Sequence, residues 1–109
     1  MATGFEIHVR QFPLPAVIEL AVMDHADRNH WVPRGQLERR FRHRIAVNWL
    51  RHRGSNYDQL VSANQKHYAE IRTAVLQEIA ELYPELADEC ARQAGRIRST
   101  ETVPHTPQT

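Results

Sequence analysis

The sequence is poor in several residue types that would otherwise point to a function. It has a single cysteine, Cys90, so no disulfide can form within the chain, and a reducing compartment is favoured. Lys66 is the only lysine among 14 basic residues. The first thirty residues lack the basic start and apolar run of a signal peptide, and Glu19 interrupts the longest apolar stretch. We therefore expect a cytoplasmic protein with no membrane-spanning segment.

The chain also lacks a complete catalytic motif, and we predict no enzymatic activity, no cofactor and no metal. Asp24, His25, Asp27 and His30 lie close together in sequence, which invites a metal interpretation. His25 and His30 are five residues apart, however, a spacing that does not align two side chains on one helix face as four would. Cys90 falls on the apolar face of a predicted helix, where we expect a buried thiol.

What the sequence does contain is the composition of one ordinary globular domain. Its 109 residues are 41% hydrophobic and 25% charged. Helical periodicity dominates and predicts an all-α fold, a small four- or five-helix bundle with an extended N-terminal arm. We place the arm at residues 1–14, the helical domain at 15–98 and a disordered tail at 99–109.

The arm has the period of a strand, because Phe5, Ile7 and Val9 alternate with polar residues. No second strand pattern follows. The segment is therefore expected either to lie against the helices or to pair with a second copy of the chain. Apolar residues at helical spacing predict three further helices outside the central segment, over residues 16–28, 65–83 and 84–97.

The most distinctive segment, residues 33–58, carries seven arginines against the single acid Glu38 before its last residue, Asp58. As one helix over 37–53, it places an apolar stripe toward the core, made of Leu37, Phe41, Ile45 and Trp49. Arginines then line both edges of this stripe, with Arg40, Arg44 and Arg51 on one side and Arg39, Arg42 and Arg53 on the other.

Two features of this helix are open at the level of sequence. Residues 15–53 have the rhythm of a helix-turn-helix, although the stretch 42–46 leaves no room for its glycine-containing turn. Asn48 and His52 fall inside the apolar stripe. They are expected either to be buried and hydrogen-bonded, with Tyr57 or Tyr68 as partners, or to emerge where the helix bends near Arg44. Gly54 is expected to end the helix in a left-handed conformation.

Charge is unevenly distributed along the chain. Residues 28–53 hold eight arginines and one acid, a balance of +7, whereas residues 58–101 hold eight acids and five bases, a balance of −3. A concentrated basic segment indicates an anionic partner. We predict a small, non-enzymatic nucleic-acid-binding protein whose helix over 34–53 contacts phosphates of DNA or RNA. The predicted binding residues are Arg34, Arg39, Arg40, Arg42, Arg44, Arg51 and Arg53.

Other functions use the same segment. In a protein-interaction or adaptor module, the basic helix would dock on an acidic protein surface. That surface could be residues 78–89 of a second copy, which would make a homodimer. A basic face that is merely solvated would have the same composition.

The stretch RHRGSNYD, residues 51–58, resembles the motif of HEPN-type ribonucleases, small all-helical proteins. In that motif an Arg is followed by a polar residue and then by a His and often a Tyr. Arg51, His52 and Tyr57 stand in comparable places, and the resemblance implies RNA cleavage. Asn56 stands where the catalytic His is expected, and asparagine cannot act as a general acid or base.

The same stretch also has a structural interpretation. Ser55 or Asn56 can cap the helix that follows, and Asp58 can pair with Arg51 or Arg53.

Overall fold

The chain is described by a computed structural model that covers residues 5–31 and 37–102, with side-chain positions through residue 95. Its elements are α1 (Leu14–Asn29), α2 (Arg39–His52), α3 (Tyr57–Ala63), η1 (Gln65–His67), α4 (Tyr68–Leu82), η2 (Pro84–Leu86) and α5 (Ala87–Thr102), where η denotes a 3₁₀ helix. The predicted all-α fold is confirmed, and no strand occurs in the described ranges. The last helix reaches Thr102 rather than residue 97, so it extends into the predicted tail, of which residues 103–109 lie outside the described part.

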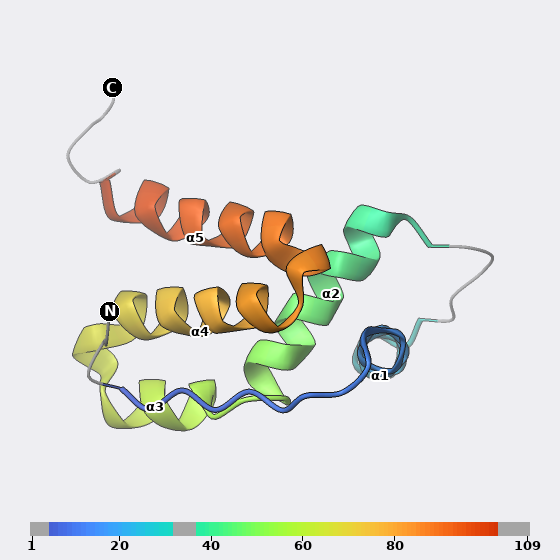
Figure 1. The fold of residues 1–109 in the computed structure, drawn as a ribbon, viewed down its shortest axis with the longest axis horizontal. Coiled ribbons are helices and arrows are strands. Elements are labelled where there is room, and N and C mark those ends of the chain that lie inside the picture. The colour runs from blue at the N-terminus through green and yellow to red at the C-terminus, as the bar shows by residue number, and fades with distance from the viewer. Residues whose placement is uncertain (1–4, 32–36, 103–109) are drawn as a thin grey trace.

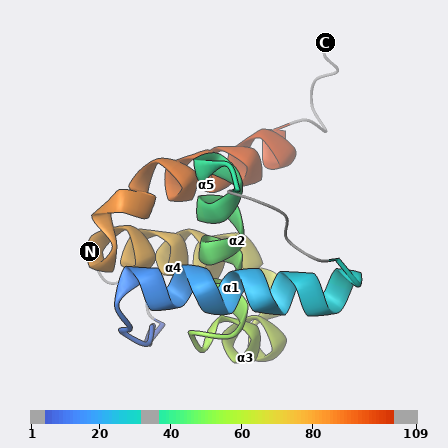
Figure 2. The same ribbon diagram turned by 90° about the vertical axis from the view of Figure 1, so that its right-hand side faces the viewer.

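The five α-helices are organised around α2. Figure 1 shows α3, α4 and α5 stacked one above another, with α2 running obliquely past one end of all three. On its other side α2 packs against α1, which crosses it steeply (Figure 2). The arginine-rich helix is therefore the central element of the bundle, in contact with each of the other α-helices.

Helix α2 is one continuous helix, as the periodicity predicted, but its core face is broader than the predicted stripe. Ile45 is buried as expected, whereas Phe41 and Trp49 are half-buried at the edge of the core. Neighbouring elements surround the second half of the helix. Residues that point in different directions are therefore buried there: Ala46, Val47, Leu50 and Arg51. A stripe calculated for a helix with one neighbour underestimates burial in a helix with four.

Gly54, just beyond the end of α2, occupies a position that requires a glycine. The left-handed conformation predicted at Gly54 is wrong, since its φ lies outside the positive range and Arg53, the last residue before it, has a φ of −107°. A Cβ added to Gly54 would lie 3.2 Å from the Cα and carbonyl oxygen of Leu50. The glycine therefore permits a close approach of two backbone segments.

The N-terminal arm is extended and lies along α3 (Figure 1). An isolated antiparallel bridge joins Val9 to Ser55, and the Arg10 N–H donates to the Gly54 carbonyl at 2.7 Å. Asn56 extends this pairing with its side chain, which accepts a hydrogen bond from the His8 N–H at 2.9 Å and donates another to the Glu6 carbonyl at 2.8 Å. In this structure the arm thus lies against the helices of its own chain.

The other end of the arm is held by Tyr83, which follows α4 and is 7% exposed. Its hydroxyl accepts a hydrogen bond from the Phe12 N–H at 2.9 Å and lies 2.8 Å from the Phe12 carbonyl oxygen, to which it donates.

Cys90 is buried as predicted, and burial raises the pKa of its thiol to about 12. None of the described helices is long and apolar enough to cross a bilayer.

Candidate functional site

The structure divides the seven predicted nucleic-acid-binding arginines among different environments. Arg34 lies outside the described residues. Arg42 is half-buried and Arg51 is buried, while Arg53 is exposed but engaged by a carboxylate. Three remain exposed on the first two turns of α2, and we call them the exposed arginine group: Arg39, Arg40 and Arg44.

The exposed arginine group makes no ion pair within 4.0 Å to any described residue. The Arg44 guanidinium lies over the face of the Phe41 ring, 5.3 Å from its centre, a cation–π contact that takes up none of its N–H groups in a hydrogen bond. Arg40 and Arg44 line a hollow of about 310 Å³ together with Arg92, and Glu38 and Glu89 line it as well. Guanidinium groups without an ion-pair partner can bind an oxyanion by donating hydrogen bonds to it.

Acidic residues of the same molecule border the exposed arginine group. Glu85 and Asp88 share a second hollow with Arg39 and Arg40. Glu89, 8% exposed, contacts Arg92 at 2.6 Å and accepts from Gln93 at 2.7 Å. Burial raises the pKa of Glu89, but the hydrogen bonds from these two residues outweigh it, so the pKa is lowered overall. The carboxylate is thus already neutralised by its own partners.

The opposite edge of α2 faces α1 and is structural. Arg53 Nη2 lies 3.2 Å from Asp24 Oδ1, and Arg28 Nε donates to the other oxygen of the same carboxylate at 2.9 Å. Arg53 therefore ties the end of α2 to α1. His25, next to Asp24, packs edge-on against Trp31 and Phe41. Within the described ranges no group of three His, Cys, Asp or Glu side chains is placed to hold a metal ion.

Arg51 occupies the most unusual environment of the six that the structure describes. It is 7% exposed and lies between α2, α3 and α4. One nitrogen, Nη2, donates to Asn48 Oδ1 at 3.3 Å and lies 3.3 Å from His52 Nε2, while the guanidinium lies 5.3 Å from the centre of the Tyr57 ring. Burial, followed by the nearby positive charge of Arg72, lowers the pKa of Arg51.

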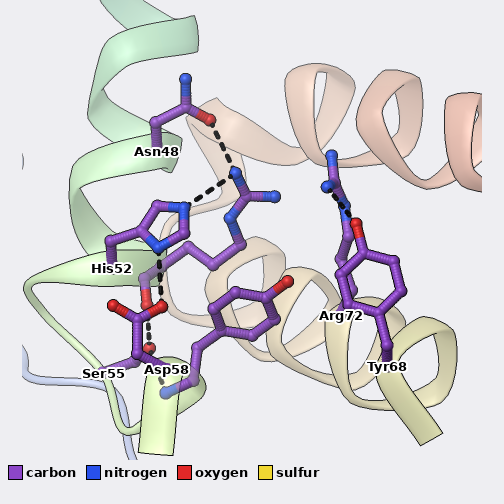
Figure 3. Close-up of polar contacts among 8 residues, drawn as sticks. Asn48, His52, Ser55, Asp58, Tyr68 and Arg72 are labelled. Carbon is purple, nitrogen blue, oxygen red and sulfur yellow. Dashed lines mark hydrogen bonds and ion pairs between the residues drawn. The ribbon is translucent and has the colours of Figure 1, made fainter. Parts of the chain in front are cut away.

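Figure 3 shows this polar cluster, with Asn48 and His52 from α2 facing Tyr68 and Arg72 from α4. Arg72 Nη1 donates to the Tyr68 hydroxyl at 3.0 Å. Three buried nitrogens of this cluster have no hydrogen-bond partner within residues 5–31 and 37–95: Arg51 Nε, Arg51 Nη1 and Arg72 Nε. No carboxylate lies within ion-pair distance of either guanidinium among the described residues.

His52 borders the cluster and is paired with Asp58. The distance from His52 Nδ1 to Asp58 Oδ1 is 2.7 Å, and the two side chains are 46% and 61% exposed. Because an Arg51 N–H can only donate, His52 Nε2 accepts from it and Nδ1 carries the proton given to Asp58. Asp58 thus pairs with His52, and the predicted pairing with Arg51 or Arg53 is wrong.

The HEPN-like stretch takes up largely structural roles in this fold. Ser55 accepts a hydrogen bond from the Tyr57 N–H at 3.1 Å and donates to the Arg51 carbonyl at 2.5 Å. The N-cap position of α3 is Asn56, whose side chain does not cap the helix. Asn56, in the place of the expected catalytic His, is committed to the backbone of the arm.

Two members of the cluster come from outside the central segment: Arg72, which sequence reasoning missed, and Tyr68, which it considered only as a hydrogen-bond partner of Asn48 or His52. They come from α4, about twenty residues beyond Arg51, and belong to no motif. The one signal in the sequence is their spacing of four residues, which places both on the same helix face. Asn48 was expected either to be buried or to emerge; it is half-buried and bonded to Arg51 and Gln93.

Comparison with known proteins gives one match. A family model described as "Uncharacterized conserved protein (DUF2293)" matches residues 8–87, which is well over half of the chain. The matched range runs from the arm to the start of α5 and includes α2 and the cluster around Arg51. No curated protein and no solved structure matches the chain.

Proposed function

The chain belongs to the DUF2293 family, and we propose that it is a non-enzymatic nucleic-acid-binding protein that contacts phosphates through the first two turns of α2. The observation that carries this proposal is the exposed arginine group, Arg39, Arg40 and Arg44, which has no ion-pair partner among the described residues. Arginine forks match phosphate oxygens in geometry as well as in charge.

The size of the exposed arginine group sets the expected salt dependence. Neutralising three phosphates gives a slope of log K against log salt of roughly −2 on single strands and roughly −3 on duplex. Raising salt from about 50 to about 200 mM should therefore weaken binding roughly 20- to 40-fold. Arg51 and Arg53 are excluded from this count, because one is buried and the other holds Asp24.

A homodimer built on the acidic segment is less well supported by the arrangement of charges. Glu85 and Asp88 already border Arg39 and Arg40 within one molecule, so this acidic surface is not presented separately from the basic one. RNA cleavage by the HEPN route lacks its histidine, because Asn56 is bonded to the arm.

The test is a binding titration with fluorescent single-stranded RNA, single-stranded DNA and duplex DNA at two salt concentrations. Arg40→Gln combined with Arg44→Gln should weaken binding about tenfold or more and lower the salt slope by between one and two. Lys66→Gln combined with Arg28→Gln removes the same charge from η1 and α1 and is the matched control. The proposal fails if the protein binds none of the three at low salt, or if both double variants behave alike.

A further inference from the structure

The polar cluster around Arg51 contains two guanidinium groups that do not belong to the exposed arginine group. We infer that the guanidinium groups of Arg51 and Arg72, between α2 and α4, form a binding site for one phosphate monoester group. The site is separate from the exposed arginine group, so this inference does not depend on the proposed function.

The first argument is that Arg51 is a buried cation without a counter-charge. Its side chain is more than nine-tenths buried, yet its hydrogen-bond partners, Asn48 and His52, are neutral in the hydrogen-bonding arrangement described above. The nearest acid that affects it, Asp58, is bonded to His52 instead. Burying an unpaired charge is costly, so such a group is expected to have a partner that is not part of the chain.

The second argument is that another cation adjoins the first. Arg72 lies close enough to Arg51 for its charge to act on it, and its Nε is also buried without a partner. Two like charges at one place repel each other unless an anion lies between them. An arrangement that is unfavourable when empty becomes favourable when an oxyanion is bound.

The third argument concerns the donors that point into the cluster. Arg51 Nε, Arg51 Nη1 and Arg72 Nε each carry an N–H that no group in the described part of the chain accepts. Two tyrosine hydroxyls stand beside them, on Tyr57 and Tyr68. Burial raises the pKa of Tyr57, so its hydroxyl keeps its proton at neutral pH and can donate. Phosphate oxygens accept several hydrogen bonds at once, which suits such a set.

Charge and depth favour a monoester over an internal diester. A phosphate monoester carries about −1.5 to −2 charges at pH 7, which balances two guanidinium groups, whereas a diester carries one. A 7% exposed guanidinium also leaves little room for a strand that must continue on both sides of the phosphate. Inorganic phosphate, a mononucleotide and the 5′-phosphate of an oligonucleotide share the required chemistry.

In the first experiment the full chain is titrated with inorganic phosphate, and binding is measured by calorimetry and by the thermal unfolding midpoint. Chloride keeps the ionic strength constant. We expect saturable binding and a midpoint that rises with phosphate concentration. Arg72→Gln should weaken binding about tenfold, the loss of one charge-assisted contact. Arg28→Gln, an exposed arginine of α1 with the same charge change, should leave it unchanged.

The second experiment distinguishes the sources of the phosphate and separates the two sites. An oligoribonucleotide with a 5′-phosphate is compared with the same oligonucleotide ending in a 5′-hydroxyl, and adenosine monophosphate is compared with adenosine. Arg40→Gln with Arg44→Gln should keep phosphate binding, while Arg72→Gln should lose the preference for the phosphorylated form. Two outcomes would overturn the inference. One is the absence of saturable phosphate binding below about 10 mM, a Kd that corresponds to only about 3 kcal/mol. The other is equal phosphate binding by Arg72→Gln and Arg28→Gln.

Discussion

Tyr83 is a single residue on which the position of the whole N-terminal arm depends. Its buried hydroxyl bonds both the N–H and the carbonyl of Phe12. Tyr83→Phe would leave these backbone groups without a partner, and we expect it to lower the free energy of unfolding by about 1–3 kcal/mol. Urea denaturation measures this loss, and hydrogen exchange should show faster exchange in residues 8–12. Ser62→Ala, which removes a hydroxyl from an exposed residue of α3, is the control and should cost less than about 0.5 kcal/mol.

Arg51 allows a sharper test of what a buried charge contributes. If the guanidinium awaits an anion, Arg51→Met should leave the phosphate-free protein unchanged or stabilise it by up to about 2 kcal/mol, since an uncompensated charge is replaced by an apolar chain of similar length. The same variant should lose phosphate binding. If Arg51 instead serves stability alone, the substitution should destabilise the protein by about 3 kcal/mol or more, as when a buried network is broken.

The difference between Arg51 and Arg44 also shows where sequence reasoning stops at this scale. Both lie on the predicted edge of α2, seven residues apart, and a helical wheel treats them alike. One is exposed and the other buried because α3 and α4 cover only the second half of α2. The wheel gives the direction of a side chain but not how far along the helix its neighbours reach. Arg72 could not be assigned at all, because only the fold brings it to Arg51.

At the scale of elements, helical periodicity was sufficient for the architecture. The all-α fold, a continuous α2 and an arm without a partner strand all follow from spacing and from the positions of proline. Ser55 or Asn56 was predicted to cap α3; Asn56 holds the N-cap position without a side-chain capping bond, and Ser55 accepts only from the N–H of Tyr57. The left-handed Gly54 was wrong, because glycine can serve a close approach as well as a turn, and the sequence does not distinguish these uses.

The contact between α2 and the start of α5 should make stability depend on pH. His43 faces Arg39 and Arg42 on α2 and Glu85 and Glu89 on η2 and α5. Burial, with the charge of Arg39, lowers its pKa below 6.5. A lowered histidine pKa means that the folded state binds its proton less readily than the unfolded state. The stability that neutral His43 contributes is therefore fully present above pH 6.5, and it is lost as the pH falls through the pKa of His43 in the folded protein.

Denaturation midpoints at pH 7.5 and 5.5 test this expectation. His43→Gln should lose less stability than the original chain over this interval, because its side chain cannot take up a proton. Equal losses in the two proteins would show that protonation of His43 is not coupled to folding.

At the scale of the molecule, acidic residues set how strongly the exposed arginine group can attract an anion. Glu85→Gln with Asp88→Asn removes two negative charges beside Arg39 and Arg40. We expect nucleic-acid affinity to rise about two- to fivefold at low salt, with a smaller gain at about 150 mM, where the Debye length is roughly 8 Å. Binding titrations measure it. Glu6→Gln with Glu19→Gln makes the same change in net charge on the arm and α1, and an equal gain there would point to net charge alone.

The central position of α2 has a consequence for how such a protein can change over time. The buried apolar residues of its last two turns are held on several sides at once, so a substitution at Ala46, Val47 or Leu50 alters folding before it alters binding. The exposed positions of the opening turns, such as Arg39, Arg40 and Arg44, can vary while the scaffold stays intact. New specificities should therefore arise at that end of the helix, with the remainder serving as a fixed foundation.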